Sequence, residues 1–512
     1  MPSLFENEEH LQLRALVRAL RAESHRSARE RVHERDHLED RGILTARRPG
    51  RTVGHEPMFA FDLSVVPPDV FAIADRLRAA GRRSWIVGGC VRDSILGKPV
   101  ADWDVATDAR PGELVKIFPR AIPTGLQHGT VTVVMRGQHY EVTTLRGEAT
   151  YSDGRRPDAV HFVNEIEADL ARRDFTINAI AVASENGALV DPFGGAKDIE
   201  RKVLRAVGDA YERFSEDGLR VLRAARFSAT LDFELDPATF AAIEPTLNTF
   251  RKVSAERVRD EWVKTMKARK PSRAFDVMRL SGILGVICPE MLEGVGMDQN
   301  KWHTFDVWGH AMACMDACVG DPVLRIAALL HDVGKPRSRA FSEKTNDYTF
   351  YDHDRIGAEI ADPICLRLKF SNDERQRIVS LVRHHLFHYD GWSDTAVRRW
   401  IRRVGKERIE DLYALNAADV RGKAVSVDDA SLDALAALKA HVEKVLAEGA
   451  ALSTRDLAID GHALMKDVGL EPGRIIGEIL EALLEEVTAD PALNERSVLL
   501  ARARILAGDR KK

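Results

Sequence analysis

The spacing of apolar residues along the chain predicts a small mixed α/β region followed by a long helical region. Residues 67–81 repeat apolar positions at helical intervals and end in Gly81, a residue type that commonly ends helices. From about Lys197 onwards, almost every segment has helical spacing. Four segments between these regions are rich in β-branched and aromatic residues, which is typical of strands. They are SWIVGG, DWDVAT, GTVTVVM and HYEVTTL.

The first 60 residues have a different pattern. Leu13, Leu16, Val17 and Leu20 fall at the intervals of one short amphipathic helix. The charged stretch after them contains few apolar residues and is expected to stay disordered. We therefore expect residues 1–60 to form a flexible, charged N-terminal extension, which is more consistent with a solvated tail than with an RNA contact.

Length and charge limit the architecture. The chain has 512 residues, and single cores usually stop growing near roughly 250–300 residues, so we expect roughly two to four domains. The net charge of −4 neither suggests nor excludes a polyanionic partner. Binding of RNA would therefore depend on local clusters of basic residues.

Cysteine content and apolar runs indicate the compartment. The 5 cysteines include no C-x-x-C pair, which argues against a disulfide framework. The first residues lack the basic and apolar regions of a signal peptide. No apolar run approaches the roughly 20 residues that span a bilayer. We expect a cytoplasmic protein without membrane contact, and the sequence does not indicate its oligomeric state.

Two glycines and three acidic residues indicate a site for phosphate and metal. Gly88 and Gly89 separate a predicted strand from a predicted helix, where backbone N–H groups can approach a phosphate. Asp102 and Asp104 are two residues apart on a predicted strand, so both carboxylates point to one face. They repel each other unless a cation lies between them, and such a pair suits two Mg²⁺ ions, although an isolated D-x-D is also a common structural feature. Glu141, on a strand that can pair nearby, is a candidate third carboxylate.

Six motifs in a fixed order connect this region to a known family. They are GGCVRD, DWD, EVTTLR, DLARRDFTINA, DPFGG and EDGLRVLRAARF, and the match to which they belong covers residues 61–285. In this order they resemble the class II tRNA nucleotidyltransferase and poly(A) polymerase family. The resemblance implies an α+β fold, with a small mixed α/β nucleotidyltransferase head of the polymerase-β type followed by an all-helical neck and further helical domains.

The same resemblance implies a reaction. Nucleotides from CTP and ATP would be added without a nucleic-acid template to the 3′ end of tRNA. Asp102, Asp104 and Glu141 would be the catalytic residues, and both aspartates would hold two Mg²⁺ ions. DPFGG, at residues 191–195, would form a hinge between head and neck.

The family's nucleotide-binding residues can also be placed on this sequence. Asp217 and Arg220, neighbours if both lie on one helix, would act as a protein template that selects CTP and then ATP. The interleaved apolar residues, such as Leu222 and Phe227, are expected in the core. The implied nucleotide-binding set is Gly88, Gly89, Arg92, Arg172, Arg173, Asp174, Asp217, Arg220, Arg223 and Arg226.

A second set of candidate residues follows in the helical region. The segment ALLHDVGK contains adjacent His331 and Asp332, and histidines flank it on both sides. This pattern resembles the HD family of metal-dependent phosphohydrolases. The resemblance implies that one divalent transition metal or Mg²⁺ is held by His310, His331, Asp332 and Asp419. A second metal has the candidate ligands His353, His384 and His385. An active site would hydrolyse phosphomonoesters or 2′,3′-cyclic phosphates, and a retained but idle domain is the alternative.

These observations predict a domain order and an RNA-binding region. The expected domains are an extension at 1–60, a head at 61–196, a neck that binds nucleotide and RNA at 197–285, an HD domain at 286–430 and a helical tail at 431–512. A basic helix face either tracks RNA phosphates or faces solvent. Its residues are Arg398, Arg399, Arg402 and Arg403.

Other functions fit parts of the pattern. A poly(A) polymerase, or an enzyme that adds only CC or only A, shares the head motifs. An HD-type nucleotide signalling hydrolase also couples two such domains, but in that class the hydrolase precedes the transferase. Intact Asp102 and Asp104 argue against a non-catalytic RNA-binding protein. The Asp217 and Arg220 pair and the following HD domain favour CCA addition.

Overall fold

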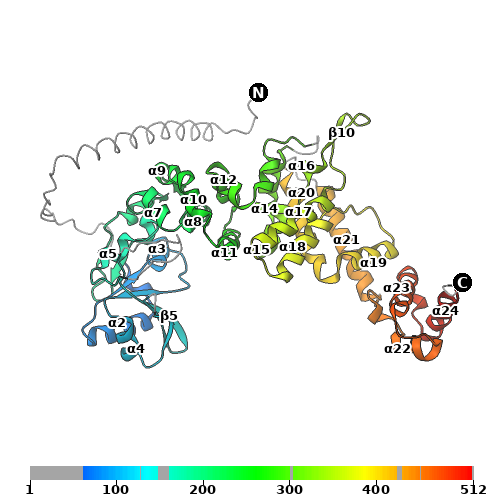
Figure 1. Ribbon diagram of the computed structural model, residues 1–512, viewed down its shortest axis with the longest axis horizontal. Coiled ribbons are helices and arrows are strands. Elements are labelled where there is room, and N and C mark those ends of the chain that lie inside the picture. Colours follow the sequence, from blue (N-terminus) through cyan, green and yellow to red (C-terminus); the bar gives the residue numbers. More distant parts are fainter. Residues whose placement is uncertain are drawn as a thin grey trace. The chain divides into compact units, whose positions relative to one another are not determined.

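The computed structural model describes residues 61–126, 129–147, 161–299, 304–423, 429–449 and 451–509. The helix and the disordered stretch expected before residue 60 lie outside these ranges. The chain forms two compact units that divide between Pro289 and Glu290. The first unit is mixed α/β and the second is almost entirely helical, which confirms the predicted fold class (Figure 1).

A seven-stranded sheet is the centre of the first unit. Its strands are β1 (Ser84–Val87), β2 (Asp104–Thr107), β3 (Ala121–Gly125), β4 (Thr130–Met135), β5 (Gln138–Thr144), β6 (Ala181–Ala183) and β7 (Leu189–Val190). Their order is β3-β4-β5-β2-β1-β6-β7, and only β2 and β5 pair in parallel. All four predicted strands are present, and β3, β6 and β7 were not predicted.

Alternation of side chains explains how the sheet is buried. In β4, Val131 and Val133 are buried whereas the residues between them are half-buried, as expected for a strand with one face in the core. Trp85 of β1 and Ala106 of β2 pack in one apolar cluster with Leu170, which comes from a helix over the sheet. Removing this apolar surface from water holds that helix in place at the edge of the site described below.

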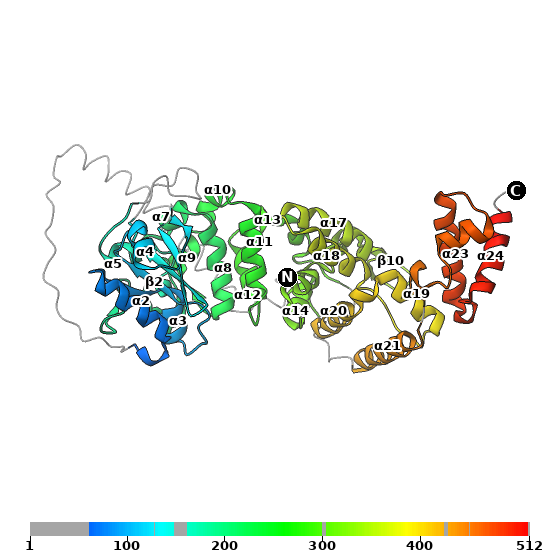
Figure 2. The ribbon, with the colours of Figure 1, turned by 90° about the horizontal axis from the view of Figure 1, so that it is seen from below.

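Helices surround the sheet and then continue alone to the end of the first unit. Helix α8 packs against both α11 and α12, and the three lie side by side (Figure 2). The helices are α2 (Pro68–Ala79), α3 (Gly89–Ile95), α4 (Pro111–Ile117), α5 (Ile166–Ala171), α6 (Gly195–Glu200), α7 (Ala210–Glu216), α8 (Leu219–Leu231), α9 (Pro237–Ala241), α10 (Leu247–Phe250), α11 (Ala255–Thr265), α12 (Ser272–Leu280) and α13 (Ile283–Ile287).

The segment DPFGG forms the start of α6. Asp191 accepts hydrogen bonds from the backbone N–H groups of Gly195 and Ala196 at 2.7 and 2.9 Å, which satisfies two donors that the helix leaves free. A Cβ atom on Gly195 would lie 2.1 Å from the carbonyl oxygen of Thr176. Only glycine therefore allows α6 to approach the chain this closely.

The second unit is a helical assembly in which α14 packs on α20 and α17 packs on α18. Its elements are α14 (Val307–Ala317), α15 (Pro322–Leu330), α16 (Lys335–Ser338), α17 (His353–Arg367), α18 (Asn372–His384), α19 (Asp394–Val404), α20 (Ile409–Gly422), α21 (Asp429–Ala447), α22 (Gly461–Ala463), α23 (Arg474–Ala489) and α24 (Arg496–Asp509), with strands β10 (Ala340–Ser342) and β11 (Asp347–Thr349). This short hairpin was not predicted, and neither was the pairing of β8 (Val203–Leu204) with β9 (Glu234–Leu235) in the first unit. No helix in the described ranges is both long and apolar enough to cross a membrane.

The basic face of α19 contacts α23. Arg398 donates to the carbonyl oxygen of Thr488 at 2.8 Å, and Arg402 donates to the hydroxyl of the same residue at 2.9 Å. Arg399 donates to Glu485 at 2.7 Å. Three of the four arginines on this face therefore hold α23 against α19. Arg399 and Arg403 are exposed, as expected for a solvated face, and a role of this face in RNA binding stays a prediction.

Candidate functional site

Strand pairing places two of the three predicted acidic residues side by side. Asp104 begins β2 and is in register with Glu141 of the parallel strand β5. Asp102 precedes β2, so the prediction that both aspartates lie on the strand is wrong for Asp102. Asp102 is exposed and Asp104 is half-buried. Trp103, between them, is buried, with an exposed fraction of 8%.

Asp104 lies in surroundings that disfavour its negative charge. Burial is the largest cause, and the charges of Glu141 and Asp102 add to it, so the pKa of Asp104 rises to about 6 against the opposing effect of Arg173. A divalent cation would remove this repulsion, so these carboxylates fit a Mg²⁺ site. Within the described ranges their ligand atoms do not all lie within 4.8 Å of one another. A bound ion would have to draw them closer.

The glycine turn between β1 and α3 brings the backbone close to an arginine. Gly88 has a φ of +79° and directly precedes α3. A Cβ atom at Gly88 would lie 2.7 Å from Nη1 of Arg173. Both the backbone angle and the nearby guanidinium therefore require glycine at this position.

Replacing Gly88 by alanine is expected to lower the free energy of unfolding by about 1–2 kcal/mol, because L residues resist positive φ. It should also weaken CTP binding, because Arg173 must move. Gly97→Ala is the matched control, since Gly97 has a φ of +63° with no atom within 4 Å of the added Cβ. Urea unfolding and CTP titration check both variants. Equal CTP affinity of Gly88→Ala and Gly97→Ala would contradict a role in nucleotide binding for the close contact between Gly88 and Arg173.

One carboxylate that was not predicted holds the two adjacent arginines. Asp169 of α5 is 1% exposed. Its Oδ1 accepts from Nη2 of Arg172 at 2.5 Å and its Oδ2 from Nη2 of Arg173 at 3.0 Å. Burial acts to raise the pKa of Asp169, but the two guanidinium groups outweigh it and keep the pKa below its usual value. The spacing of three and four residues on a helix was the available signal.

Asp174 belongs to a chain of hydrogen bonds that runs from Arg223 of α8 to Arg92 of α3, the helix after the glycine turn. Its Oδ2 accepts from Nε of Arg223 at 2.7 Å, and its Oδ1 accepts from Nδ2 of Asn178 at 3.0 Å. Asn178, which was not predicted, accepts in turn from Nη1 of Arg92 at 2.6 Å. Burial acts to raise the pKa of Asp174, but the charge of Arg223 outweighs it and the pKa falls to about 2. Asp174 is therefore an ionised counter-ion whose oxygens are already occupied by protein donors.

Asp217 and Arg220 are arranged differently from the prediction. Asp217 has an extended backbone and precedes α8, so the two residues do not share a helix. Asp217 accepts from the backbone N–H of Leu219 at 3.0 Å and from Nη2 of Arg257 at 2.8 Å. Arg220 donates to the carbonyl oxygen of Arg172 at 2.9 Å. Each side chain is fixed by other groups rather than by its predicted partner.

Phe227 is a core residue with a second contact surface. As expected, it is buried. The guanidinium groups of Arg226, Arg223 and Arg92 also lie 3.9, 5.2 and 5.4 Å from its ring centroid. Arg226 pairs in addition with Glu261 at 2.5 Å. One aromatic ring thus holds three like charges at fixed positions through cation–π contacts.

Most of these groups meet at one cavity, although Asp102, Asp169, Arg257 and Glu261 are not part of its lining. The cavity has a volume of about 660 Å³ and is lined by eight basic and four acidic side chains. Every predicted nucleotide-binding residue lines it, together with Asp104 and Glu141. Thr130, Thr143, Arg146, Asn178, Phe227 and Lys264 also line it and were not predicted to bind nucleotide.

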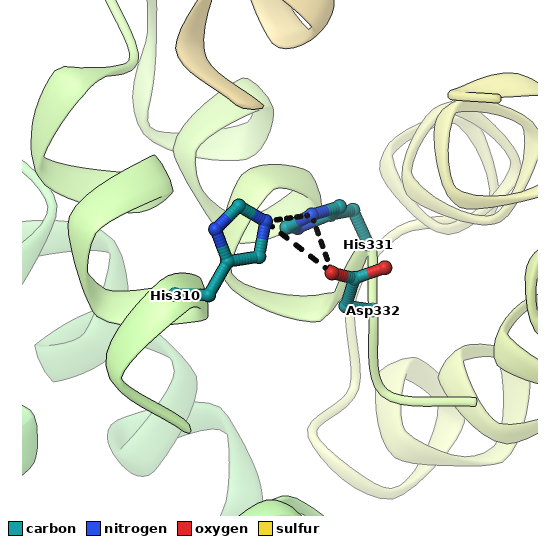
Figure 3. A group of neighbouring side chains, drawn as sticks. All are labelled: His310, His331 and Asp332. Atoms are coloured by element: carbon teal, nitrogen blue, oxygen red, sulfur yellow. Dashed lines mark hydrogen bonds and ion pairs between the residues drawn. The ribbon is translucent and has the colours of Figure 1, made fainter. Parts of the chain in front are cut away.

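The second unit contains a compact group of histidine and aspartate side chains. Nε2 of His310 lies 3.2 Å from Nε2 of His331, and the two nitrogens lie 3.3 and 3.1 Å from Oδ2 of Asp332 (Figure 3). Oδ1 of Asp419 lies 2.9 Å from Nε2 of His310. Three ligand atoms, from His310, His331 and Asp332, thus lie within 4.8 Å of one another, and Asp419 of α20 adjoins the two histidines.

Backbone carbonyl groups orient the imidazole rings. Nδ1 of His331 lies 2.7 Å from the carbonyl oxygen of Ala328, and Nδ1 of His310 lies 3.3 Å from that of Gly422. This arrangement leaves Nε2 of each ring directed at the centre of the group. It is the orientation that outer hydrogen bonds give to metal-binding histidines, so the residues present fit a divalent metal.

Asp332 also belongs to a second group. Its Oδ1 lies 3.4 Å from Nε2 of His353 and 3.7 Å from Nε2 of His385, and these two nitrogens are 3.3 Å apart. Burial lowers the pKa of His385 to about 3, which keeps its imidazole in the neutral form that binds metals. His384 is half-buried and lies outside both groups of the described residues. The choice left open between the two adjacent histidines falls on His385.

Comparisons with known proteins identify three parts of the chain. Three family models match the chain, described as "Poly A polymerase head domain" over residues 84–205, "Probable RNA and SrmB- binding site of polymerase A" over 232–294 and "HD domain" over 303–421. Together with the α/β head and its basic cavity, these matches define a nucleotidyltransferase that carries an HD domain.

Comparison with individual proteins shows to which family of nucleotidyltransferases the chain belongs. The CCA-adding enzyme of Ligilactobacillus salivarius (strain UCC118) is 32% identical over 443 residues, which cover 86% of this chain and 97% of that protein. The CCA-adding enzyme of Listeria monocytogenes serotype 4b (strain F2365) is 47% identical over 236 residues, 46% of this chain and 58% of that protein. The crystal structure of Bacillus stearothermophilus CCA-adding enzyme in complex with CTP has a TM-score of 0.67 at 26% identity, covering 86% of this chain and 98% of that one. The chain belongs to the family of CCA-adding enzymes.

Proposed function

We propose that this chain adds cytidine, cytidine and adenosine in turn to the 3′ end of tRNA in the cytoplasm, using CTP and ATP. The observation that carries the proposal is a single cavity that joins Asp104 and Glu141 to eight basic side chains. A triphosphate requires cationic donors around its oxygens. The 3′-hydroxyl that attacks it requires an acidic metal site beside it. Membership of the family supports CCA as the added sequence.

The proposed step is a nucleotidyl transfer. The 3′-hydroxyl oxygen of the RNA forms a bond to the α-phosphorus and loses its proton, while the bond to the β-phosphate breaks and pyrophosphate leaves. Asp102, Asp104 and Glu141 would hold two Mg²⁺ ions, which would supply Lewis acidity to the reacting oxygens. Arg172 and Arg173 orient the triphosphate, since Asp169 fixes both guanidinium groups beside the cavity. The residues contribute position and charge, with no covalent intermediate.

Base selection is proposed to depend on Asp217 and Arg220. An acceptor and a planar set of donors can pair with the Watson–Crick edge of cytosine or adenine. Arg257 and the backbone fix Asp217, and the carbonyl oxygen of Arg172 fixes Arg220. Because both side chains are held before a nucleotide arrives, little conformational entropy is lost on binding.

A primer-extension assay tests this function. Purified protein is given tRNA that lacks its terminal CCA, with CTP and ATP singly and together, and products are resolved to single nucleotides. We expect three additions with both nucleotides and then an arrest, and two additions with CTP alone. Open-ended addition of A without use of CTP would instead identify a poly(A) polymerase. Addition of only CC or only A with both nucleotides present would identify a partial-adding enzyme.

A second proposed activity is hydrolysis of phosphate esters by the second unit. It is favoured by the two convergent groups that share Asp332. His310, His331, Asp332 and Asp419 would hold one divalent transition metal or Mg²⁺, and His353 and His385 would hold a second together with Asp332. Phosphomonoesters or 2′,3′-cyclic phosphates at damaged tRNA ends are the proposed substrates.

The residues around these groups would position the ester. In the proposed hydrolysis a water oxygen bonds to phosphorus, one bond from phosphorus to a sugar oxygen breaks, and that oxygen takes up a proton. The metal, when bound, supplies Lewis acidity to the attacking water. Nζ of Lys335 lies 2.6 Å from Oδ2 of Asp332 and 2.7 Å from Oε1 of Gln299. This buried ammonium group is a fixed cation that can orient a phosphate oxygen.

A further inference from the structure

A hairpin with several aromatic residues lies in the sequence between Asp332 and His353, two residues of the metal-binding groups. The chain leaves the first group at Lys335, passes through α16, forms β10 and β11 and returns at His353. We call residues 339–351 the aromatic hairpin. Its strands pair from Ala340 to Thr349, and the ribbon projects from the helices of its unit (Figure 1).

Large aromatic side chains of this hairpin face solvent. Phe341 is 57% exposed and Tyr351 is 81% exposed. Phe341 meets Tyr348 edge to face, with ring centroids 5.6 Å apart. An isolated two-stranded ribbon gains little stability from its backbone, so aromatic side chains left exposed on one are unfavourable for folding. Both exposed rings belong to one short hairpin, and exposed apolar side chains that occur together mark interaction sites.

The hairpin also holds an arginine without an acidic partner. The Arg339 guanidinium group lies 3.6 Å from the ring centroid of Tyr348. Its Nε is buried and donates no hydrogen bond, and no carboxylate of the described residues pairs with it. Buried donors are nearly always satisfied in folded proteins, so this group points to a ligand with acceptor oxygens.

The base of the hairpin is fixed against the metal-binding groups. Nδ1 of His353 lies 2.6 Å from the carbonyl oxygen of Phe350. Nζ of Lys335 lies 5.7 Å from the ring centroid of Phe350 and 2.6 Å from Oδ2 of Asp332. One end of the hairpin, at Phe350 and the adjacent Tyr351, therefore lies beside these groups.

We propose that the aromatic hairpin stacks the base of a single-stranded RNA 3′ end whose terminal phosphate lies at the two metal-binding groups. The proposal rests on the hydrolase activity proposed above. Unpaired bases stack on aromatic side chains and on arginine planes, and arginine donors bind the adjoining phosphates. Phe341 and Tyr351 offer exposed rings, and Nε of Arg339 is a donor without an acceptor. The hairpin thereby makes the hydrolase selective for phosphates carried on an unpaired nucleotide.

Two cyclic phosphate substrates distinguish recognition of the base from hydrolysis of the ester. One is a short RNA that ends in adenosine 2′,3′-cyclic phosphate, and the other is glycerol 1,2-cyclic phosphate, which has no base. With Mn²⁺ present, Phe341→Ala and Tyr351→Ala are expected to raise KM for the RNA about tenfold, the loss typical of one stacking contact, at nearly constant kcat. Hydrolysis of the glycerol ester should not change. Phe341→Trp should retain the KM of the wild type, and Thr345→Ala at the turn of the hairpin is the matched control.

Binding is measured in parallel with the same RNA carrying 2-aminopurine at its 3′ end. Stacking quenches its fluorescence, and the two alanine variants should lose part of that quenching relative to Thr345→Ala. If neither ester is hydrolysed, the hydrolase proposal fails, and the fluorescence alone decides for or against the hairpin. Unchanged KM and unchanged quenching in Phe341→Ala and Tyr351→Ala would overturn the inference and leave this surface to a protein partner.

Discussion

Replacing Asp104 by asparagine is expected to abolish nucleotide addition and leave the protein folded. The substitution keeps the size of the side chain but removes its charge from the position in register with Glu141. The loss in kcat should be about 10³-fold or more, because removing even one preorganised electrostatic contact costs roughly 10²–10³-fold. Because the native environment raises the pKa of Asp104 to about 6, the charged form is disfavoured in the folded state at neutral pH. A neutral amide should therefore maintain or increase the free energy of unfolding. Single-turnover incorporation of CTP and urea unfolding measure the two effects.

Asp102 provides a direct comparison with Asp104. It lies outside the cavity lining and is exposed, yet the proposed reaction makes it a metal ligand. An equally large loss of kcat in Asp102→Asn would support the proposal that both aspartates move together to bind the ion. Full addition by Asp102→Asn would restrict the chemistry to Asp104 and Glu141. Full addition by Asp104→Asn would be incompatible with the proposed site.

The second large effect is expected from Asp332→Asn. Asp332 is the one residue common to the two groups of potential ligands, and it is almost completely buried. Burial acts to raise its pKa, but the charges of His331 and Lys335 outweigh it and hold the pKa well below the usual value, so the carboxylate is available to a metal at neutral pH. Its loss should remove divalent metal from both groups and reduce ester hydrolysis to background. Metal content after dialysis and hydrolysis of a cyclic phosphate are the measurements.

Two controls separate this effect from a general disturbance of the second unit. His384→Ala changes a histidine beside the groups but outside them, so metal content should be retained. Asp419→Asn alters one group only and should leave metal at the other. CCA addition by Asp332→Asn should equal that of the wild type. Loss of addition together with hydrolysis would show that the two activities do not have separate sites.

Sequence periodicity was enough to predict the acidic residues of the head site, because the direction of a side chain on a strand depends on local geometry alone. The two-residue period of a strand set the side to which Asp104 points, and a neighbouring strand was enough to suggest Glu141. The place where the strand begins depends instead on pairing with β1 and β5, so Asp102 was assigned to it incorrectly. Adjacent residues at a helix end point about 100° apart. Only the packing of α18 on α17 therefore distinguishes His385 from His384.

Tertiary contacts explain the larger difference at Asp217. Helical spacing made Asp217 and Arg220 neighbours, but the backbone of Asp217 is extended and α8 begins after Gly218. A Cβ atom on Gly218 would lie 2.5 Å from Cα of Phe250, so the start of α8 packs against a segment that is distant in sequence. Asp169 and Asn178 were missed for a related reason, because each acts by holding an arginine and neither belongs to a recognisable acidic or metal-binding pattern.

The excess of basic over acidic side chains around the head cavity links stability to metabolism. Carboxylates such as Asp169, Asp174 and Glu261 pair with several of the eight cationic groups and hold them in place before a nucleotide arrives. A triphosphate finds these donors together only in the folded state, and any ligand that binds only the folded state shifts the unfolding equilibrium. Resistance of the first unit to heat and to proteases should therefore rise and fall with the nucleotide supply of the cell, so that starvation would shorten the lifetime of the protein as well as slow its reaction.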